Sequence, residues 1–322
     1  MFENTHFPKA KKFWYLGEIK EWKEPTIHVM SHALHYGTSV FEGIRAYNTE
    51  KGPAIFRLKE HLDRFMYSAS VLHMDVPFSK EEIRDVIFHV MKENNLDTAY
   101  IRPLLFYSYG NLGLVPKHSQ LEMLVAAWEW SAYLGEAGNR GAHVNIIPWR
   151  RIHHSQFDQK AKLGGLYVLS TLSGVLARNK GYDEAVYLNL EGNIAEGPGA
   201  NIFIIKDGVV KTNDMSESIL EGITRTSVLK LAADIGLECQ VGPITKQDFF
   251  QADEAFFTGT AVEIASIVHV TDDSDPADAG IKYSIGTGKV GEITKKIKSL
   301  YLEVVRGQHD AYADWLTHVY NK

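Results

Sequence analysis

Apolar and polar residues alternate along much of the first sixty positions, which is the pattern of strands with one buried face. Residues 13–16 lead through Gly17 into residues 18–22, and residues 39–47 lead through a Lys-Gly-Pro turn into residues 54–58. Glycine and proline at these points favour tight reversals of the chain. The pattern therefore predicts two hairpins at the start of the chain.

A helical period follows the hairpins. Apolar residues recur at spacings of three and four across residues 58–74, and Ser79 with Glu82 predicts a capping box at the start of a second helix. Residues 99–107 and 121–130 are rich in β-branched and aromatic side chains and predict further strands. The first part of the chain is therefore expected to be α+β.

A glycine-rich, polar stretch at residues 131–141 predicts a connecting loop between two domains. Beyond it, the same reasoning predicts helices at 166–179, 223–235 and 290–305, and strands at 183–190, 201–205, 209–212, 254–258 and 264–270. No internal repeat interrupts this order. We therefore expect a domain in residues 1–130, a loop at 131–141 and a domain in residues 142–322.

Composition narrows the class of protein. The 322 residues carry a formal charge of −6, with 45% hydrophobic and 23% charged residues, which is typical of a soluble globular protein. No long run of lysine and arginine offers the clustered charge that nucleic-acid phosphates require. A small molecule is therefore the expected partner, and nucleic acid is not.

Location is predicted from apolar runs and from cysteine. Residues 121–130 form one of the longest apolar runs, far short of the ~20 residues that span a bilayer, and residues 1–12 lack the apolar core of a signal peptide. The single cysteine, Cys239, excludes a disulfide within the chain and a zinc site built from several cysteines. We expect a cytoplasmic protein that does not associate with a membrane.

Several motifs suggest chemistry that their context does not support. Gly286, Gly288 and Gly291 match a dinucleotide fingerprint, but no strand with an acidic residue follows at the required distance, so a glycine-rich start of a helix is expected. His28, His32 and His35 have helical spacing, yet hydrogen-bonded neutral histidines explain them better than a metal site does. A nucleophile elbow is absent from the sequence. We expect no metal ion and no serine or cysteine hydrolase.

Two short segments indicate a charged, phosphorylated cofactor. Lys162 precedes the glycine pair 164–165, and a lysine in a tight apolar setting can be neutral and condense with an aldehyde, although most lysines simply lie at the surface. Glu196 is surrounded by small residues that let the backbone approach a ligand, so its carboxylate could hold the proton of a pyridinium ring.

Two further segments predict an anion site. Gly222-Ile223-Thr224-Arg225 opens a helix, and Gly259-Thr260-Ala261 combines small residues with a hydroxyl. Exposed N–H groups at the start of a helix suit a phosphate, whereas each segment taken alone could equally be a helix cap or a turn.

Together these segments resemble the branched-chain aminotransferases, which are fold type IV enzymes that use pyridoxal 5′-phosphate. The resemblance runs from about Trp14 to the last helices and also includes residues 28–45, 60–64 and 99–103. It implies an α+β fold with a small N-terminal α/β domain and a larger C-terminal, cofactor-binding domain that has a β-barrel-like core. It also implies a homodimer, or a larger homo-oligomer, whose subunits share the active site.

The resemblance assigns the cofactor to seven residues. Lys162 matches the lysine that forms the Schiff base, with Lys160 as the alternative, and Glu196 matches the partner of the pyridine nitrogen. The remaining contacts, to the phenolic oxygen and the phosphate, are implied for Tyr167, Arg64, Ile223, Thr224 and Thr260.

The resemblance also implies a ping-pong transamination between L-leucine, L-isoleucine or L-valine and 2-oxoglutarate, with glutamate as the other acidic partner. The substrate residues fall into four groups: the α-carboxylate contacts Tyr100, Thr260 and Ala261; the apolar walls Phe41, Trp130 and Tyr167; the distal-carboxylate contacts Arg102 and Tyr133; and Tyr36 with Leu114 from the second subunit.

Departures from the family pattern leave alternatives open. Leu166 stands where relatives usually carry asparagine, and Pro198 and Ala200 vary the glycine-rich stretch after Glu196. A D-amino acid or (R)-amine transaminase, or an aminodeoxychorismate lyase, shares the fold, and a non-catalytic pyridoxal-phosphate-binding protein is a further alternative. Tyr100, Arg102 and the stretch 28–45 favour the branched-chain type.

Overall fold

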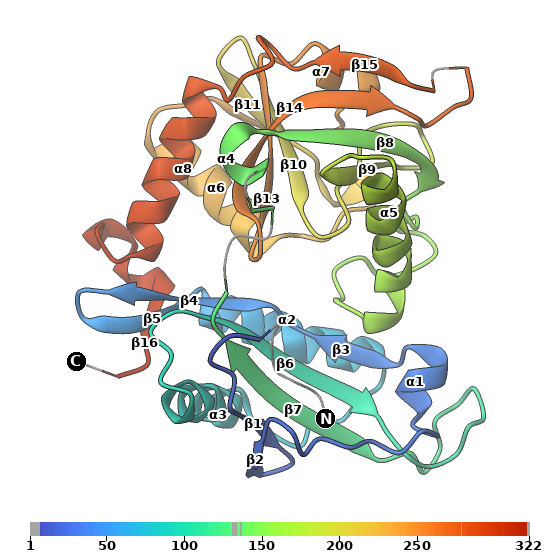
Figure 1. Ribbon diagram of the computed structural model, residues 1–322, viewed down its shortest axis with the longest axis vertical. Coiled ribbons are helices and arrows are strands. Elements are labelled where there is room, and N and C mark those ends of the chain that lie inside the picture. Colours follow the sequence, from blue (N-terminus) through green and yellow to red (C-terminus); the bar gives the residue numbers. More distant parts are fainter. Residues whose placement is uncertain (1–6, 131–133, 136, 278, 321–322) are drawn as a thin grey trace. The chain divides into compact units, whose positions relative to one another are not determined.

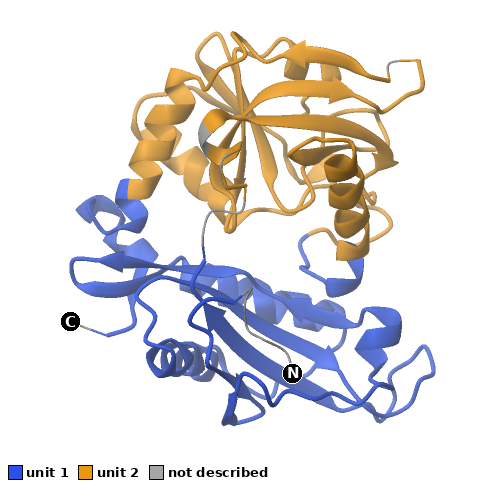
Figure 2. Ribbon diagram, in the orientation of Figure 1, with its two compact units in different colours: residues 1–131, 160–166, 303–322 blue, residues 132–159, 167–302 orange. Residues whose placement is uncertain are grey.

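The chain divides into two compact units, which are described separately. A computed structural model describes residues 7–130, 134–135, 137–277 and 279–320 (Figure 1). Unit 1 comprises residues 1–131, 160–166 and 303–322, and unit 2 comprises residues 132–159 and 167–302 (Figure 2). The domain limits expected from the sequence remain a prediction. The contacts nevertheless add two later segments, 160–166 and 303–322, to the N-terminal unit.

Unit 1 is built on an eight-stranded antiparallel sheet. Its order is β16-β5-β4-β6-β7-β1-β2, and β3 pairs with β6. The strands are β1 (Lys12–Tyr15), β2 (Glu18–Glu21), β3 (Ser39–Phe41), β4 (Ile44–Thr49), β5 (Gly52–Phe56), β6 (Ala99–Tyr107), β7 (Leu121–Trp128) and β16 (Leu316–His318). Both expected hairpins are present, as β1–β2 and β4–β5. Figure 1 shows the C-terminal strand β16 beside β5 from the early part of the chain.

The expected strand 39–47 is interrupted at Glu42 and Gly43, so that β3 and β4 are separate strands. A Cβ atom on Gly43 would lie 2.0 Å from the hydroxyl of Tyr100, so any larger residue here would force the Tyr100 side chain to move. Because the strand is broken at Glu42, this side chain is not bound to the alternation between the two faces of the sheet that a regular strand imposes.

Helices of unit 1 cover the sheet with the side chains that the periodicity predicted. Helix α2 (Leu58–Val71) buries Leu58, Leu62, Phe65 and Ala69, and α3 (Lys80–Glu93) begins with the expected capping box of Ser79 and Glu82. Apolar burial on one helical stripe is what holds such helices to a sheet. The short helix α1 (His32–Tyr36) and the 3₁₀ segments η1 (Gly164–Leu166) and η3 (Asp310–Trp315) complete the unit.

Unit 2 contains the second eight-stranded sheet, with parallel and antiparallel pairs. Its order is β12-β11-β10-β13-β14-β8-β9, and β15 pairs with β14. The strands are β8 (Ala142–Arg150), β9 (Glu184–Leu188), β10 (Asn201–Lys206), β11 (Val209–Thr212), β12 (Cys239–Val241), β13 (Glu254–Gly259), β14 (Glu263–Asp272) and β15 (Ile281–Ser284). The pairs β8–β9, β8–β14 and β11–β12 are parallel.

The expected β-barrel-like core is an open sheet in the part of the chain that the structure describes. Strands β12 and β9 stand at opposite ends of the strand order. A single residue, Ile194, forms isolated bridges to Leu188 of β9 and to Ile244, shortly after β12. One residue cannot form a ladder, so the sheet curls toward closure without closing.

The helices of unit 2 are α4 (Ala137–Arg140), α5 (Tyr167–Asn179), α6 (Ile223–Asp234), α7 (Lys246–Phe250) and most of α8 (Glu292–Val305), with the 3₁₀ segment η2 (Met215–Glu217). The core of the unit includes fully buried Val186, Phe257 and Val270 from three strands. No helix in the described ranges combines the length and the apolar character needed to cross a membrane. The mixture of helices and two sheets confirms the expected α+β class.

Candidate active site

Most of the expected site residues fall into two clusters, one in each unit, together with neighbours that the sequence did not single out. The first, called the Lys162 cluster, comprises Phe41, Glu42, His61, Arg64, Ser68, Tyr100, Arg102, Trp130 and Lys162 of unit 1. The second, called the Glu196 cluster, comprises Arg151, Glu196, Asn201, Leu220, residues 222–224 and residues 259–261 of unit 2. Each cluster is described by itself.

Lys162 is held by its main chain on both sides. Its N–H donates to Ser68 Oγ at 2.8 Å, and its carbonyl accepts a hydrogen bond from the N–H of Phe41 at 3.4 Å. Its flanking residues Ala161 and Leu163 are each only 3% exposed. Its Nζ lies 5.0 Å from the centroid of the Phe41 ring. Lys162 is half-buried, whereas Lys160 is exposed, so only the first has the confined setting that the chemistry requires.

The glycine pair allows the chain after Lys162 to lie directly against β3. A Cβ atom on Gly164 would lie 2.1 Å from Ser39 Oγ. Gly37 has φ +67°, and a Cβ atom there would lie 2.7 Å from the Cα of Gly165. The absence of side chains at Gly164 and Gly37 thus lets the segment that carries Lys162 lie close to its neighbours.

Arg64 is oriented by a fully buried carboxylate. Its Nε and Nη2 donate to Glu42 Oε1 and Oε2 at 2.6 and 2.9 Å, and His61 Nδ1 lies 2.8 Å from Glu42 Oε2. Burial by itself would raise the pKa of Glu42, but the Arg64 guanidinium and the His61 hydrogen bond outweigh it and hold this pKa well below its ordinary value. Burial lowers the pKa of His61. Glu42 is therefore an ionised anchor for the Arg64 side chain.

Replacement of this anchor by an uncharged isostere should destabilise the fold. We expect Glu42→Gln to lower the free energy of unfolding by ~3–5 kcal/mol, because the buried Arg64 charge loses its charged partner. Since the pKa of Glu42 is lowered in the folded state, its contribution is present above its ordinary pKa of 4.5 and is lost as the pH falls below that value. Chemical unfolding at pH 7 and at pH 4 measures both effects.

The matched control for this variant is Glu60→Gln on the same helix. Glu60 accepts a hydrogen bond from Arg57 at 2.7 Å, but its side chain is 38% exposed. An ion pair with one solvent-exposed partner contributes ~1 kcal/mol or less, whereas Glu42 is fully buried. Equal destabilisation by the two substitutions would contradict the anchoring role of Glu42.

Aromatic rings surround Arg102. Its guanidinium lies 4.6 Å from the Phe41 centroid and 5.3 Å from the Tyr100 centroid, and its Nη2 donates to the Tyr100 hydroxyl at 3.0 Å. Tyr100 and Arg102 share one face of β6 because they are two residues apart. The Tyr100 and Trp130 ring centroids are 4.9 Å apart. The structure thus brings four of the expected substrate residues together, while Tyr133 lies outside the described residues.

Glu196 is a buried carboxylate with three donors. Arg151 Nε donates to its Oε1 at 2.7 Å, and Asn201 Nδ2 and the N–H of Leu220 donate to its Oε2 at 3.1 and 3.2 Å. Its side chain is 6% exposed. Hydrogen bonds from a cation and two amides favour the ionised form of a carboxylate. Sequence reasoning missed Arg151 and the role of Asn201, because both act through contacts that no spacing reveals.

The expected anion-binding segments meet at Asn201. Helix α6 starts at Gly222, where a Cβ atom would lie 2.0 Å from Asn201 Oδ1, and Thr224 in its first turn is 2% exposed. At Gly259 a Cβ atom would lie 3.0 Å from the carbonyl of Gly199. Residues 196–201, 222–224 and 259–261 are therefore neighbours, and the N-terminal N–H groups of the twelve-residue helix α6 lie at this junction.

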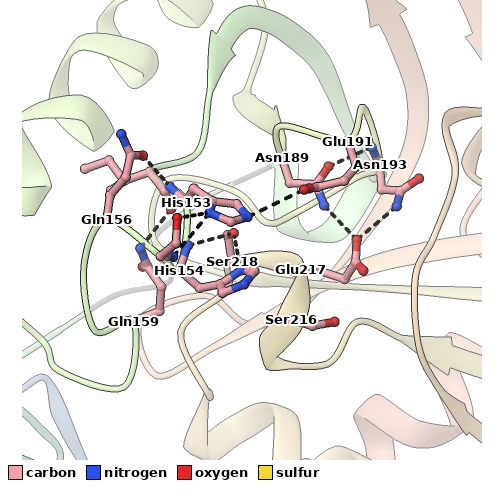
Figure 3. A network of polar contacts seen from close by, with 12 residues as sticks. His153, His154, Gln156, Gln159, Asn189, Glu191, Asn193, Ser216, Glu217 and Ser218 are labelled. Carbon is pink, nitrogen blue, oxygen red and sulfur yellow. Dashed lines mark hydrogen bonds and ion pairs between the residues drawn. The ribbon is translucent and has the colours of Figure 1, made fainter.

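A polar network supports one side of the Glu196 cluster (Figure 3). Buried Glu217 accepts hydrogen bonds from Asn189 Nδ2 at 2.7 Å and Asn193 Nδ2 at 3.1 Å. The N–H of His154 donates to Ser218 Oγ at 3.2 Å, and the ring of His153 lies 3.5 Å from Glu191. The network ties the loop after Arg151 to the segment that leads to Leu220, and no sequence pattern identified it.

The remaining expected residues, Tyr167, Tyr36 and Leu114, are not members of either cluster. Tyr167 is the first residue of α5 in unit 2. Tyr36 is 45% exposed, and its hydroxyl donates to the carbonyl of Leu112 at 3.1 Å. Leu114, in the same loop, is 82% exposed. Neither of these two apolar side chains is buried within unit 1.

The motifs set aside in the sequence have ordinary structural roles. Gly286 has φ +51°, and a Cβ atom there would lie 2.1 Å from the carbonyl of Asp253. Gly291 leaves room for Glu254, which accepts hydrogen bonds from the first turn of α8. These glycines mark the start of a helix, as expected. His32 contacts Thr38 and Gly113, and His35 contacts the carbonyl of Val29.

The chemical groups of the two clusters, each cluster taken by itself, are of the kinds that pyridoxal 5′-phosphate requires. A confined primary amine suits an aldehyde, and a buried ionised carboxylate suits a protonated pyridine nitrogen. A helix N-terminus lined by hydroxyl-bearing and small residues suits a phosphate. These three functions are the ones that a phosphorylated pyridine aldehyde requires.

Comparisons with known proteins agree with this chemistry. The family described as Amino-transferase class IV matches residues 39–270. A branched-chain-amino-acid aminotransferase of Pseudomonas aeruginosa is 43% identical over 307 residues, covering 95% of this chain and 96% of the relative. The Escherichia coli branched-chain-amino-acid aminotransferase is 39% identical over 313 residues, covering 97% of this chain and 98% of the relative.

Solved structures give the same result. The branched-chain amino acid aminotransferase of Thermoproteus uzoniensis, a thermophilic archaeon, was solved with norvaline and matches with a TM-score of 0.87 and 36% identity, and 97% of this chain and 100% of the other are covered. The Escherichia coli enzyme matches with a TM-score of 0.89 and 37% identity, with coverage of 96% and 99%.

Proposed function

Because this chain belongs to the class IV aminotransferases, we propose that it transfers the amino group of L-leucine, L-isoleucine or L-valine to 2-oxoglutarate, with pyridoxal 5′-phosphate as its cofactor. The similarity to branched-chain-amino-acid aminotransferases extends over nearly the whole chain. The single observation that carries the proposal is the Glu196 carboxylate, which is buried and held by three donors.

The cofactor contacts are proposed residue by residue from the family resemblance. Lys162 would attach it through the ε-amine, Glu196 would contact the pyridine nitrogen, and Tyr167 would contact the phenolic oxygen. Arg64, Ile223, Thr224 and Thr260 would contact the phosphate. The fixed guanidinium of Arg64 and the first turn of α6 support this assignment, because both present donors without a need for rearrangement.

When bound, pyridoxal phosphate supplies an electron sink for the pair released at the substrate Cα. Lys162 Nζ would accept the proton from the substrate Cα and would donate it again later in the half-reaction. Glu196, whose ionised form the hydrogen bond from Arg151 favours, would hold a proton on the pyridine nitrogen. The second half-reaction would use the same groups in reverse, and the kinetics would be ping-pong because the first product leaves before the second substrate binds.

Substrate recognition is proposed to use the aromatic surroundings of Arg102. Phe41, Trp130 and Tyr167 would form walls for an aliphatic side chain, while Tyr100, Thr260 and Ala261 would contact the α-carboxylate. Arg102, with Tyr133, would accept the distal carboxylate of glutamate or 2-oxoglutarate. The ring of Phe41 lies against the guanidinium, so apolar and charged surfaces are adjacent in one cluster.

Arg102→Ala should reduce activity with glutamate much more than activity with leucine. We expect kcat/KM for glutamate to fall by about 100-fold, because a charge-assisted contact with the distal carboxylate is lost, and kcat/KM for leucine to change by less than about threefold. Initial rates with each amino donor measure the difference. Arg102→Lys keeps the positive charge, so its kcat/KM for glutamate should fall less than that of Arg102→Ala. Equal losses on both donors would contradict the proposed role.

The active form is proposed to be a homodimer, or a larger homo-oligomer, in which Tyr36 and Leu114 enter the site of the neighbouring subunit. The exposure of both side chains and of the apolar neighbours Val29, Leu34 and Val115 supports a buried position in an assembly. Sedimentation of the active enzyme tests this, and an active monomer would contradict it.

A cytoplasmic location is proposed from the cysteine content. Cys239 is the single cysteine of the chain and is a free thiol, as is common in a reducing compartment. Fractionation of the source cells tests the location, and recovery from an extracytoplasmic fraction would contradict it.

The visible absorption spectrum of the purified protein tests the proposed function. We expect a band with bound pyridoxal phosphate that L-leucine bleaches and 2-oxoglutarate restores, because each half-reaction changes the state of the cofactor. A protein that stays colourless with added pyridoxal phosphate would refute the proposal. A band that responds to D-alanine or an (R)-amine, but not to L-leucine, would show that the proposed substrate class is wrong. The proposed cofactor site would still stand.

A further inference from the structure

One buried hydroxyl connects helix α2 to the main chain of Lys162. Ser68 is fully buried, at 0% exposure, and lies one turn after Arg64 on this helix. Its Oγ donates to the carbonyl of Arg64 at 2.8 Å and accepts the N–H of Lys162 at 2.8 Å. The same hydroxyl thus contacts both the helix residue that bears the guanidinium and the residue that bears the reactive amine.

The contact with Ser68 lies on the N-terminal side of Lys162, next to a segment that is held against β3. On the C-terminal side of Lys162, the carbonyl accepts from Phe41, Leu163 bridges to Val40, and Gly164 lies against Ser39. On the N-terminal side, Lys160 is exposed, but its neighbours Gln159 and Ala161 are buried, at 4% and 3% exposure. Ser68 therefore anchors the main chain immediately before the segment that lies against β3.

We propose that Ser68 is a positioning residue that fixes the main chain of Lys162, and through it the range that the ε-amine can reach. This inference rests on the proposed aminotransferase function. Without the hydroxyl, the peptide group before Lys162 loses this anchor, while the contacts on its C-terminal side remain. The amine, at the end of a four-carbon chain, then samples more positions, and proton transfer slows while substrate contacts are kept.

Ser68→Ala tests this role without a large threat to the fold. Alanine is the best helix former, and the substitution removes one oxygen from a helix interior that otherwise stays packed. The matched control is Ser173→Ala on α5. Ser173 is also fully buried, donates to the carbonyl of Leu169 at 2.6 Å and accepts from the Tyr187 hydroxyl at 2.7 Å, so it has the same pair of contacts without a lysine main chain.

Three measurements on the holoenzyme are compared between the parent, Ser68→Ala and Ser173→Ala. For Ser68→Ala we expect kcat with leucine to fall by roughly 10- to 100-fold, with KM changed by less than about threefold. We also expect faster amide hydrogen exchange in the peptide that contains Lys162, and a shifted midpoint in the pH titration of the visible band. Ser173→Ala should leave all three close to the parent.

The outcomes separate this inference from the proposed function. If the parent has no visible band and no turnover, the proposed function itself fails. If the parent is active, a Ser68→Ala enzyme with kcat within about twofold of the parent, or with unchanged exchange at Lys162, overturns the positioning role. Equal effects of both serine variants would likewise overturn it, because a general packing loss would then explain them.

Discussion

Lys162→Ala is expected to abolish transamination and to leave the protein folded. The ε-amine is proposed both to hold the cofactor and to move the substrate proton, so its removal should lower kcat by more than about 10⁴-fold. The main-chain contacts of residue 162 with Ser68 and Phe41 do not involve the side chain and should persist. Steady-state turnover of leucine with 2-oxoglutarate, together with thermal unfolding, measures both expectations.

Lys160→Ala is the matched control, because this lysine is two residues away and exposed. It should retain kcat within about twofold of the parent. Activity that survives Lys162→Ala and disappears with Lys160→Ala would transfer the role to Lys160. The structure supports the first assignment through the buried neighbours of Lys162 and its distance of 5.0 Å from the Phe41 ring.

Local patterns predicted those elements whose causes are local. The capping box of α3, the hairpins β1–β2 and β4–β5, and the apolar stripe of α2 each depend on residues a few positions apart. The sequence did not predict β8, and it did not predict that β16 would pair with β5. Parallel pairing and pairing between the two ends of the chain leave no periodic signal, because the partner strand is absent from the local window.

The same division applies to the site. Lys162 and Glu196 could be identified because glycines and other small residues, which chain geometry demands, lie next to them in the sequence. Arg151, Ser68 and Asn201 could not, because a hydrogen bond to a distant segment does not alter the residues beside the donor. Arg64 was assigned by resemblance, but its anchor Glu42 required the structure.

Each cluster contains a buried ion pair. Glu42 fixes the cation Arg64, and Arg151 fixes the anion Glu196. The first pair is buried to 14% and 0% side-chain exposure, and the second to 10% and 6%. Such pairing keeps a functional charge ionised in a poorly hydrated place and limits its movement, so that little reorganisation is needed during the reaction.

Glu196→Gln should therefore slow the chemical step more than it weakens cofactor binding. A neutral amide cannot hold the proton on the pyridine nitrogen, and loss of one preorganised electrostatic contact costs about 10²–10³-fold in kcat. The amide oxygen can still accept from Arg151, so the local fold should survive. Single-turnover rates with leucine measure the step, and titration with pyridoxal phosphate measures affinity.

Glu254→Gln is the control for the loss of a glutamate charge in the same unit. Glu254 accepts hydrogen bonds from Ile293 and Thr294 at the start of α8, so its replacement should lower stability and leave the rate near that of the parent. Equal single-turnover rates for Glu196→Gln and the parent would refute the pyridinium role. A rate loss confined to Glu196→Gln would show that the chemical step needs the negative charge itself. The glutamine variant retains the size of the side chain and the hydrogen-bond acceptor at Oε1.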